Sequence, residues 1–103
     1  MRSITICGVK YKVQYVDEIR SSNDQRLLGM CDETNKTISI ESGKSKEETA
    51  EIEMHEVLHA VINNSGAYEL FAREGIDRPI DFAELLIRII SPHLSSALRS
   101  IKQ

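Results

Sequence analysis

Two histidines and a glutamate lie together near the middle of the chain, in the run His55-Glu56-Val57-Leu58-His59. This is the HExxH pattern, and its spacing has a physical basis. Residues four apart lie one turn apart on the same face of an α-helix, so both imidazoles can reach one metal ion. Glu56 points in a different direction, where it is placed to take the proton from a metal-bound water that attacks a carbonyl. The pattern predicts a Zn2+ site on His55 and His59, with Glu56 as the general base.

A catalytic zinc site needs a third protein ligand and leaves the fourth position for water. The metzincin pattern would place a glycine three residues after His59 and a histidine three residues later. Ile62 and Ser65 stand at those positions, which excludes that subclass. The remaining option is a side chain from a later helix. The candidates are Glu69, Glu74, Asp77, Asp81, Glu84 and, less favoured, His93.

Glu84 is the strongest of these candidates. The helix expected over residues 80–90 is apolar almost all round, and its only polar stripe consists of Asp81, Glu84 and Arg88. A carboxylate on a mostly buried helix needs a partner, and zinc is a sufficient one. Two other arrangements stay open, an ion pair of Glu84 with Arg88 and a capping box with Asp81. Asp81 also remains an alternative ligand.

Four other side chains could assist the site. Tyr68 could stabilise an oxyanion, although a tyrosine that opens a short helix is more often a packing residue. Asn63 or Asp77 could orient a ligand imidazole. His93 follows Pro92 and is more simply a surface histidine. For each of them a structural role is favoured.

A long helix must carry the motif. Ser45 and Glu48 fit a capping box at its start, and Gly66 is suited to the conformation that ends a helix. Between them, apolar residues recur at steps of three and four and predict one buried stripe. A short helix over residues 68–74 should follow, then one over 80–90, with a break or kink at Pro92 and a last segment over 94–101. The stripe consists of Ala50, Met54, Val57, Leu58, Val61 and Ile62.

The residues before the helix read as strands. Alternation of apolar and polar side chains predicts strands over residues 3–7 and 10–16, and two more are expected over 27–32 and 37–41. Turn-forming residues over 32–36 predict a hairpin between the last two. Residues 17–26 are polar and predict a loop or a short helical turn. Strands first and helices second predict an α+β fold, with a small antiparallel or mixed sheet packed on the HExxH helix.

Length and composition set the broader limits. The 103 residues predict a single domain over residues 1–103. Thirteen basic against sixteen acidic residues argue against a nucleic-acid-binding protein. No apolar run is long enough to span a membrane and no signal peptide is recognisable, so a cytoplasmic location is expected. Cys7 and Cys31 have no CxxC spacing and are expected to be reduced thiols.

Two stretches together resemble a known group. The run Gly29-Met30-Cys31-Asp32-Glu33-Thr34-Asn35-Lys36-Thr37-Ile38-Ser39-Ile40, followed by Met54-His55-Glu56-Val57-Leu58-His59-Ala60, resembles small zincins encoded by phages and bacteria. These are gluzincins related to the ImmA/IrrE-type metallopeptidases. The resemblance covers residues 27–90, and only its central motif is sharply specific.

The resemblance implies zinc on His55, His59 and Glu84, Glu56 as general base, and a minimal zincin-like fold. It also implies that the strand over residues 37–41 takes up an extended peptide or protein substrate at a sheet edge. The short chain leaves the cleft open and shallow, which favours a narrow regulatory or phage-related substrate by analogy. The alternative is a non-catalytic module in which zinc is structural or the site is vestigial. The oligomeric state is not predicted.

Overall fold

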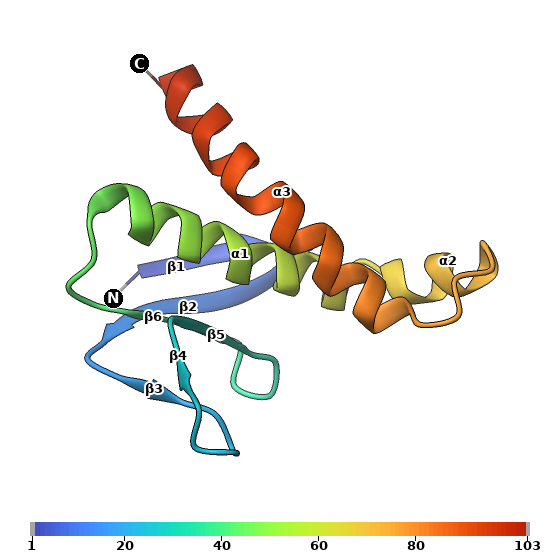
Figure 1. The fold of residues 1–103 in the computed structure, drawn as a ribbon, viewed down its shortest axis with the longest axis horizontal. Coiled ribbons are helices and arrows are strands. Elements are labelled where there is room, and N and C mark those ends of the chain that lie inside the picture. Colours follow the sequence, from blue (N-terminus) through green and yellow to red (C-terminus); the bar gives the residue numbers. More distant parts are fainter. Residues whose placement is uncertain (1, 103) are drawn as a thin grey trace.

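The computed structural model describes residues 2–102 and has six strands followed by three helices (Figure 1). This order confirms the predicted α+β fold. The strands are β1 (Arg2–Ile6), β2 (Val9–Val16), β3 (Ile19–Arg20), β4 (Arg26–Leu27), β5 (Gly29–Asp32) and β6 (Thr37–Glu41). The helices are α1 (Lys46–Asn64), α2 (Ala67–Arg73) and α3 (Pro79–Lys102).

Four strands form a mixed sheet in the order β1-β2-β6-β5. β1 pairs with β2, and β5 with β6, in the antiparallel sense, whereas β2 and β6 are parallel. The predicted hairpin between β5 and β6 is confirmed, because Asp32 pairs with Thr37 across its turn. The turn between β1 and β2 depends on Cys7 and Gly8, which both have positive φ, a conformation typical of tight hairpin turns.

The prediction that residues 37–41 form a sheet edge is wrong. β6 lies between β2 and β5, so its backbone is paired on both sides. Its last four residues are also buried on both faces of the sheet, as expected for an interior strand. The strand that ends the sheet beside α1 is β5, which has β6 as its only partner among the described strands.

The stretch predicted as a polar loop contains a second, two-stranded sheet. β3 and β4 pair in the antiparallel sense, with Ile19 opposite Leu27. Ile19 is buried, and β3 also contacts β6. This ribbon places Arg26 near Glu41 at the end of β6, where the two side chains form an ion pair.

The core lies between the sheet and α1. Alternate residues of β2 and β6 point into it, and Ala60 is the contribution of α1 that is fully buried. The predicted stripe of α1 is correct in part. Val57 and Val61 pack against the core, but Ile52 does so as well, although the periodicity did not assign it there. The buried core residues are Ile6, Tyr11, Val13, Ile38, Ile40 and Ala60.

The start of α1 is as predicted, since the Ser45 hydroxyl accepts a hydrogen bond from the backbone N–H of Glu48 at 3.1 Å. Gly66 has a positive φ of 76° and lies between α1 and α2. α2 matches the predicted short helix within one residue at each end. These boundaries agree with the sequence because capping and turn residues act locally.

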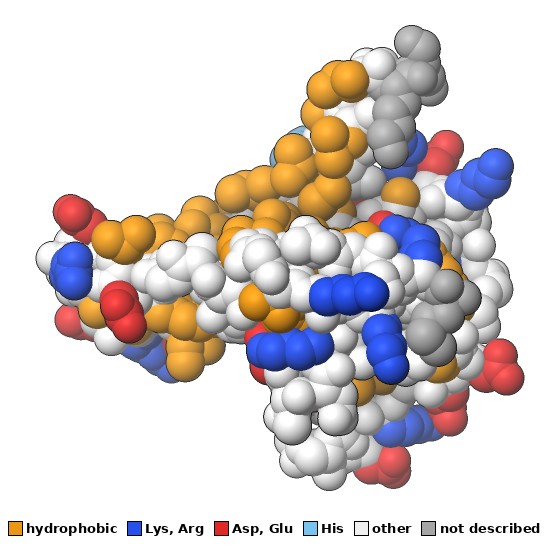
Figure 2. All heavy atoms as spheres, turned by 180° about the vertical axis from the view of Figure 1, so that it is seen from behind, with side chains coloured by type: hydrophobic (Ala, Val, Ile, Leu, Met, Phe, Trp, Pro, Cys, Tyr) orange, Lys and Arg blue, Asp and Glu red, His pale blue; other side chains and the backbone are white. Residues whose placement is uncertain are grey.

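α3 departs from prediction in two ways. It runs without a break through Pro92, and it crosses α1 before it extends beyond the sheet (Figure 1). It is also not mostly buried. Figure 2 shows exposed apolar side chains along the arm that α2 and α3 form. The exposed apolar residues of α3 are Ile80, Leu85, Ile89, Ile90, Leu98 and Ile101. No helix within the described residues is long and apolar enough to cross a membrane.

Candidate metal centre

The two histidines of the motif face each other on α1. Their Nε2 atoms are 3.3 Å apart, and their ring centroids are 5.0 Å apart. This arrangement follows from the helix, since residues 55 and 59 are separated by about one turn of 3.6 residues. Both imidazoles are half-buried, where α1 passes under α3.

Glu84 brings a carboxylate from α3 to the two histidines. Its Oε2 lies 3.0 Å from His59 Nε2, and its Oε1 lies 3.7 Å from His55 Nε2. One ligand atom from each of the three residues lies within 4.8 Å of the other two. The crossing of α1 and α3 therefore gathers the three side chains that the sequence predicts as metal ligands.

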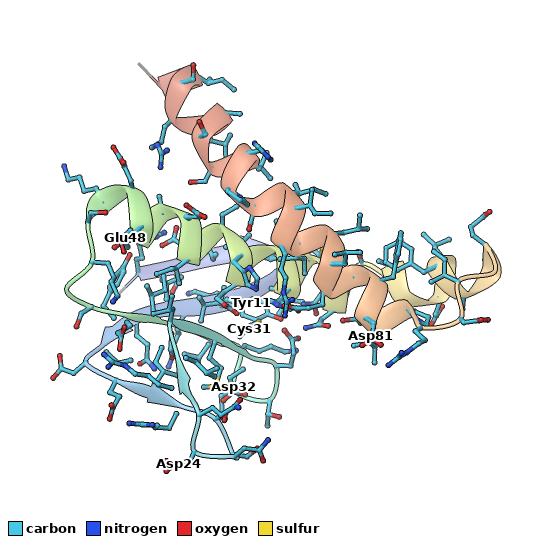
Figure 3. The ribbon with its side chains drawn as sticks, viewed as in Figure 1. Tyr11, Asp24, Cys31, Asp32, Glu48 and Asp81 are labelled. Carbon is cyan, nitrogen blue, oxygen red and sulfur yellow. The ribbon has the colours of Figure 1, made fainter. Side chains whose placement is uncertain are left out.

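The other candidate ligands lie elsewhere. Asp81 is near the N-terminal end of α3 (Figure 3), where it pairs with Arg78 at 2.6 Å and its side chain is 60% exposed. Glu69, Glu74, Asp77 and His93 are exposed. Within residues 2–102, no other histidine, cysteine, aspartate or glutamate joins the group of three. The geometry thus favours Glu84 over Asp81.

The donor set fits zinc. Zn–N bonds of about 2.0–2.1 Å at a tetrahedral angle place two imidazole nitrogens about 3.3 Å apart. The separation of the two Nε2 atoms is 3.3 Å, and the nitrogen–oxygen separations of 3.0 and 3.7 Å lie on either side of that value. Two imidazoles and one carboxylate are also a ligand set that catalytic zinc sites use.

Glu56 lies beside this group but does not belong to it. Its residue is 7% exposed, and burial, assisted by the nearby charge of Glu84, raises the pKa of its carboxyl to about 7. Among the described residues it has no hydrogen bond or ion pair with a side chain. Burial of a carboxylate without a cation is unfavourable, and such groups are concentrated at functional sites. Its pKa suits a group that exchanges a proton near neutral pH.

Gly29 is a residue of the site that the sequence analysis did not single out. A Cβ atom at this position would lie 2.8 Å from Ile52 Cγ2 and 2.9 Å from Glu56 Oε2. Only glycine therefore lets the start of β5 come this close to α1. The available signal was a glycine inside an apolar strand pattern, which often marks a close approach of backbone.

Two clefts meet at His55 and Glu56. The larger has a volume of about 560 Å³ and extends along the N-terminal half of α1 towards β4 and the middle of α3. The smaller, of about 300 Å³, extends towards the C-terminal half of α1 and includes His59, Asn63 and Glu84. Both are bounded by Gly29 of β5. All three candidate ligands thus line the smaller cleft, and the larger cleft adjoins it at His55 and Glu56.

Hydrogen bonds connect β2, β5 and the C-terminal end of α1 on the side of the core. The Tyr11 hydroxyl donates to Glu33 at 2.8 Å and accepts from Asn64 at 2.6 Å. Cys31 lies beside Tyr11 below α1 (Figure 3) and donates to Glu33. Burial, with Glu33 next in importance, raises the pKa of the Cys31 thiol well above its ordinary value. Cys31 therefore stays protonated at neutral pH and is unsuited to bind a metal as thiolate.

The side chains considered as possible assisting residues make no hydrogen bond with His55 or His59 within the described residues. The Tyr68 hydroxyl donates to Asn63 Oδ1 at 3.0 Å, and Tyr68 borders neither cleft. Neither Asn63 nor Asp77 is hydrogen-bonded to an imidazole among residues 2–102, so the expected orienting contact is absent there. Arg88, in contrast, lies 3.5 Å from Glu84 and borders the larger cleft.

Comparison with known proteins does not extend these observations. No family model matches the chain, and no curated protein or solved structure is similar to it. The resemblance of residues 27–90 to ImmA/IrrE-type metallopeptidases stays a prediction from the motif residues.

Proposed function

We propose that the chain is a zinc metallopeptidase with a minimal zincin-like fold. The observation that carries the proposal is the convergence of His55, His59 and Glu84 at the crossing of α1 and α3, beside an unpaired buried Glu56. Three protein ligands and one adjacent base are the parts that hydrolytic zinc sites share.

The side chains divide the chemistry between them. His55, His59 and Glu84 hold the ion, and zinc, when bound, supplies a Lewis acid that polarises the scissile carbonyl and makes water acidic. Glu56 takes a proton from the attacking water as the new C–O bond forms. It then gives that proton to the leaving amine as the C–N bond breaks, which leaves a carboxylate and a free amine. The carboxyl of Glu56 therefore ends each cycle as it began.

The substrate is a peptide segment in extended form. β5 ends the described sheet beside α1, and Gly29 brings its backbone next to Glu56. A peptide that pairs with β5 gains main-chain hydrogen bonds and passes from one cleft to the other across the metal centre. Both clefts are open, which fits a flexible segment of one particular protein better than general proteolysis.

A non-catalytic zinc module is the alternative. A structural zinc site is closed by four protein ligands, whereas a catalytic one leaves a position for water. Only three ligands converge here within the described residues, and the next acid of α3, Asp81, pairs with Arg78 instead. The three-ligand set supports catalysis over a structural role.

A peptide library tests the proposal. The zinc-loaded protein is incubated with peptides from a digested proteome, and new termini are identified by mass spectrometry. We expect a limited set of cleavages that a chelator abolishes and added zinc restores, and that are absent with Glu56→Gln. Cleavage that persists at full rate in zinc-loaded Glu56→Gln would contradict the mechanism. A wild type that binds zinc but produces no cleavage would favour the non-catalytic module.

A further inference from the structure

Arg88 follows Glu84 by one turn of α3. Its Nε lies 3.5 Å from Glu84 Oε1, and its side chain is 70% exposed. It borders the larger cleft together with His55 and Glu56. A permanent cation thus stands at the entrance to the metal centre.

The guanidinium group of Arg88 has N–H groups without a hydrogen-bond partner among the described residues. The contact with Glu84 uses Nε, and no hydrogen bond of the two terminal nitrogens is found within residues 2–102. Arg26, the other arginine of this cleft, is different. Its Nε and Nη2 both donate to Glu41 Oε1, at 2.9 and 2.6 Å. Arg88 is therefore the arginine of the cleft that has both terminal nitrogens available for a ligand among the described residues.

We propose that Arg88 donates a hydrogen bond to the oxygen that becomes negatively charged at the scissile carbonyl. The inference rests on the proposed peptidase function. When the water oxygen bonds to the carbonyl carbon and Glu56 takes the proton, the electron pair of the C=O bond moves to the carbonyl oxygen. That charge moves back when the C–N bond breaks and the amine receives the proton. A cation near this oxygen stabilises the transition state more than the ground state, because the negative charge forms only in the transition state.

Two other roles for Arg88 predict different measurements. If Arg88 only holds Glu84 in place, its loss weakens zinc binding and leaves kcat normal at saturating zinc. If it binds a carboxylate of the substrate, its loss raises KM for peptides with a free C-terminus and spares amidated ones. Stabilisation of the oxyanion predicts a lower kcat for amidated, uncharged peptides with zinc affinity unchanged.

The experiment compares Arg88→Met, Arg88→Lys and the matched control Arg78→Met, which removes a surface cation just before α3. Each protein is saturated with zinc and tested on an amidated peptide from the library. We expect kcat/KM to fall by about 10²–10³-fold in Arg88→Met, with partial recovery in Arg88→Lys and no change in Arg78→Met. The zinc dissociation constant, measured by chelator competition, should stay within about threefold of the wild type, a change below 1 kcal/mol.

A second readout does not require turnover. A phosphonamidate peptide is tetrahedral and anionic at the reacting position, so its dissociation constant should rise in Arg88→Met by the same factor as kcat/KM falls. A hydroxamate of the same sequence, which lacks the tetrahedral group, should lose much less affinity. Equal phosphonamidate affinity in wild type and Arg88→Met, or no binding to either, would overturn the inference. Absence of peptide cleavage by the wild type would instead count against the proposed function, while the inhibitor comparison would still decide the role of Arg88.

Discussion

Two glutamates are buried among the described residues, and their surroundings are opposite. Glu41, at the end of β6, is 2% exposed and lies 2.6 Å from Arg26 Nη2 and 3.2 Å from Lys44 Nζ. The hydrogen bond from Arg26, followed by that from Lys44, holds the pKa of Glu41 below its ordinary value. Glu56, on α1, has no cation paired with it among the described residues, and burial raises its pKa to about 7.

These different surroundings suit the two glutamates to different roles, one structural and one chemical. A buried carboxylate with two cations is fixed in its charged form and holds the β3–β4 ribbon to the sheet. A buried carboxylate without a cation can gain and lose a proton near neutral pH, which is what a general base must do. The same residue type therefore has a structural role at the end of β6 and a proposed catalytic role on α1.

The largest expected effect is on catalytic activity, which should differ between variants of the two glutamates. Glu56→Gln should lower kcat/KM by about 10²–10⁴-fold, because the amide cannot accept the proton of the attacking water. Glu41→Gln is the matched control and should keep activity in the protein that remains folded. Peptide hydrolysis at saturating zinc and at a temperature well below unfolding measures both. Equal losses in the two variants would remove the distinction between the glutamates.

The second effect is an opposite dependence of stability on pH in the metal-free protein. The folded pKa of Glu56 lies above its ordinary value of 4.5, so its stabilising contribution is complete below pH 4.5 and is lost as the pH rises through about 7. The loss is on the order of 3 kcal/mol, and Glu56→Gln should remove it. The folded pKa of Glu41 lies below 4.5, so its contribution is present above that pH and is lost on acidification.

Urea unfolding of the metal-free protein between pH 3 and 8 measures these two dependences. Relative to the wild type, Glu56→Gln should gain stability as the pH rises from about 4.5 to about 7. Glu41→Gln should be less stable than the wild type at neutral pH, and the difference should shrink in acid. Parallel curves for the wild type and both variants would show that neither glutamate has the environment described here.

A smaller effect is expected from Gly29→Ala. This substitution tests whether the backbone of β5 lies as close to the Glu56 side chain as the structure shows. The added methyl group would lie within 2.9 Å of the Glu56 carboxylate, so either β5 or Glu56 must move. We expect a loss of about 1–3 kcal/mol in the free energy of unfolding and a lower kcat. Gly8→Ala is the control for glycine replacement, because it strains a positive φ but meets no atom within 4 Å. Unchanged activity in Gly29→Ala would place Glu56 further from β5 than the structure does.

The smallest effect comes from Ser45→Ala, which removes the N-cap of α1. The free energy of unfolding should fall by about 1 kcal/mol. Peptide hydrolysis at 25 °C should be unchanged, since the cap contacts neither glutamate of the comparison. A large loss of activity would mean that modest destabilisation alone impairs the site, and the Gly29→Ala result would then need another explanation.

The sequence predicted what local rules govern. The HExxH spacing on a capped helix, the β5–β6 hairpin and the short α2 all depend on residues within one or two turns of each other. The choice of Glu84 also came from the sequence, because a carboxylate on a helix of apolar residues needs a partner. The structure places Glu84 beside both histidines, although the premise was wrong, since much of the apolar surface of α3 is exposed.

Non-local pairing could not be predicted in the same way. Nothing in residues 37–41 indicates that they pair in parallel with β2, so β6 was expected at an edge that belongs to β5. Pro92 was expected to break or kink the helix, but α3 continues through it, and Ser91 and Ser95 on either side of it are buried. The cations of Glu41 come from different segments, and only the fold brings Arg26 to it.

Zinc content per chain tests the central claim most directly. The wild type, Glu84→Ala and the control Asp81→Ala are purified without chelator, supplied with zinc, desalted and measured by atomic spectroscopy. The account predicts one zinc per chain in the wild type and in Asp81→Ala, and little in Glu84→Ala. Equal zinc in the wild type and Glu84→Ala, or none in the wild type after zinc is supplied, would contradict it.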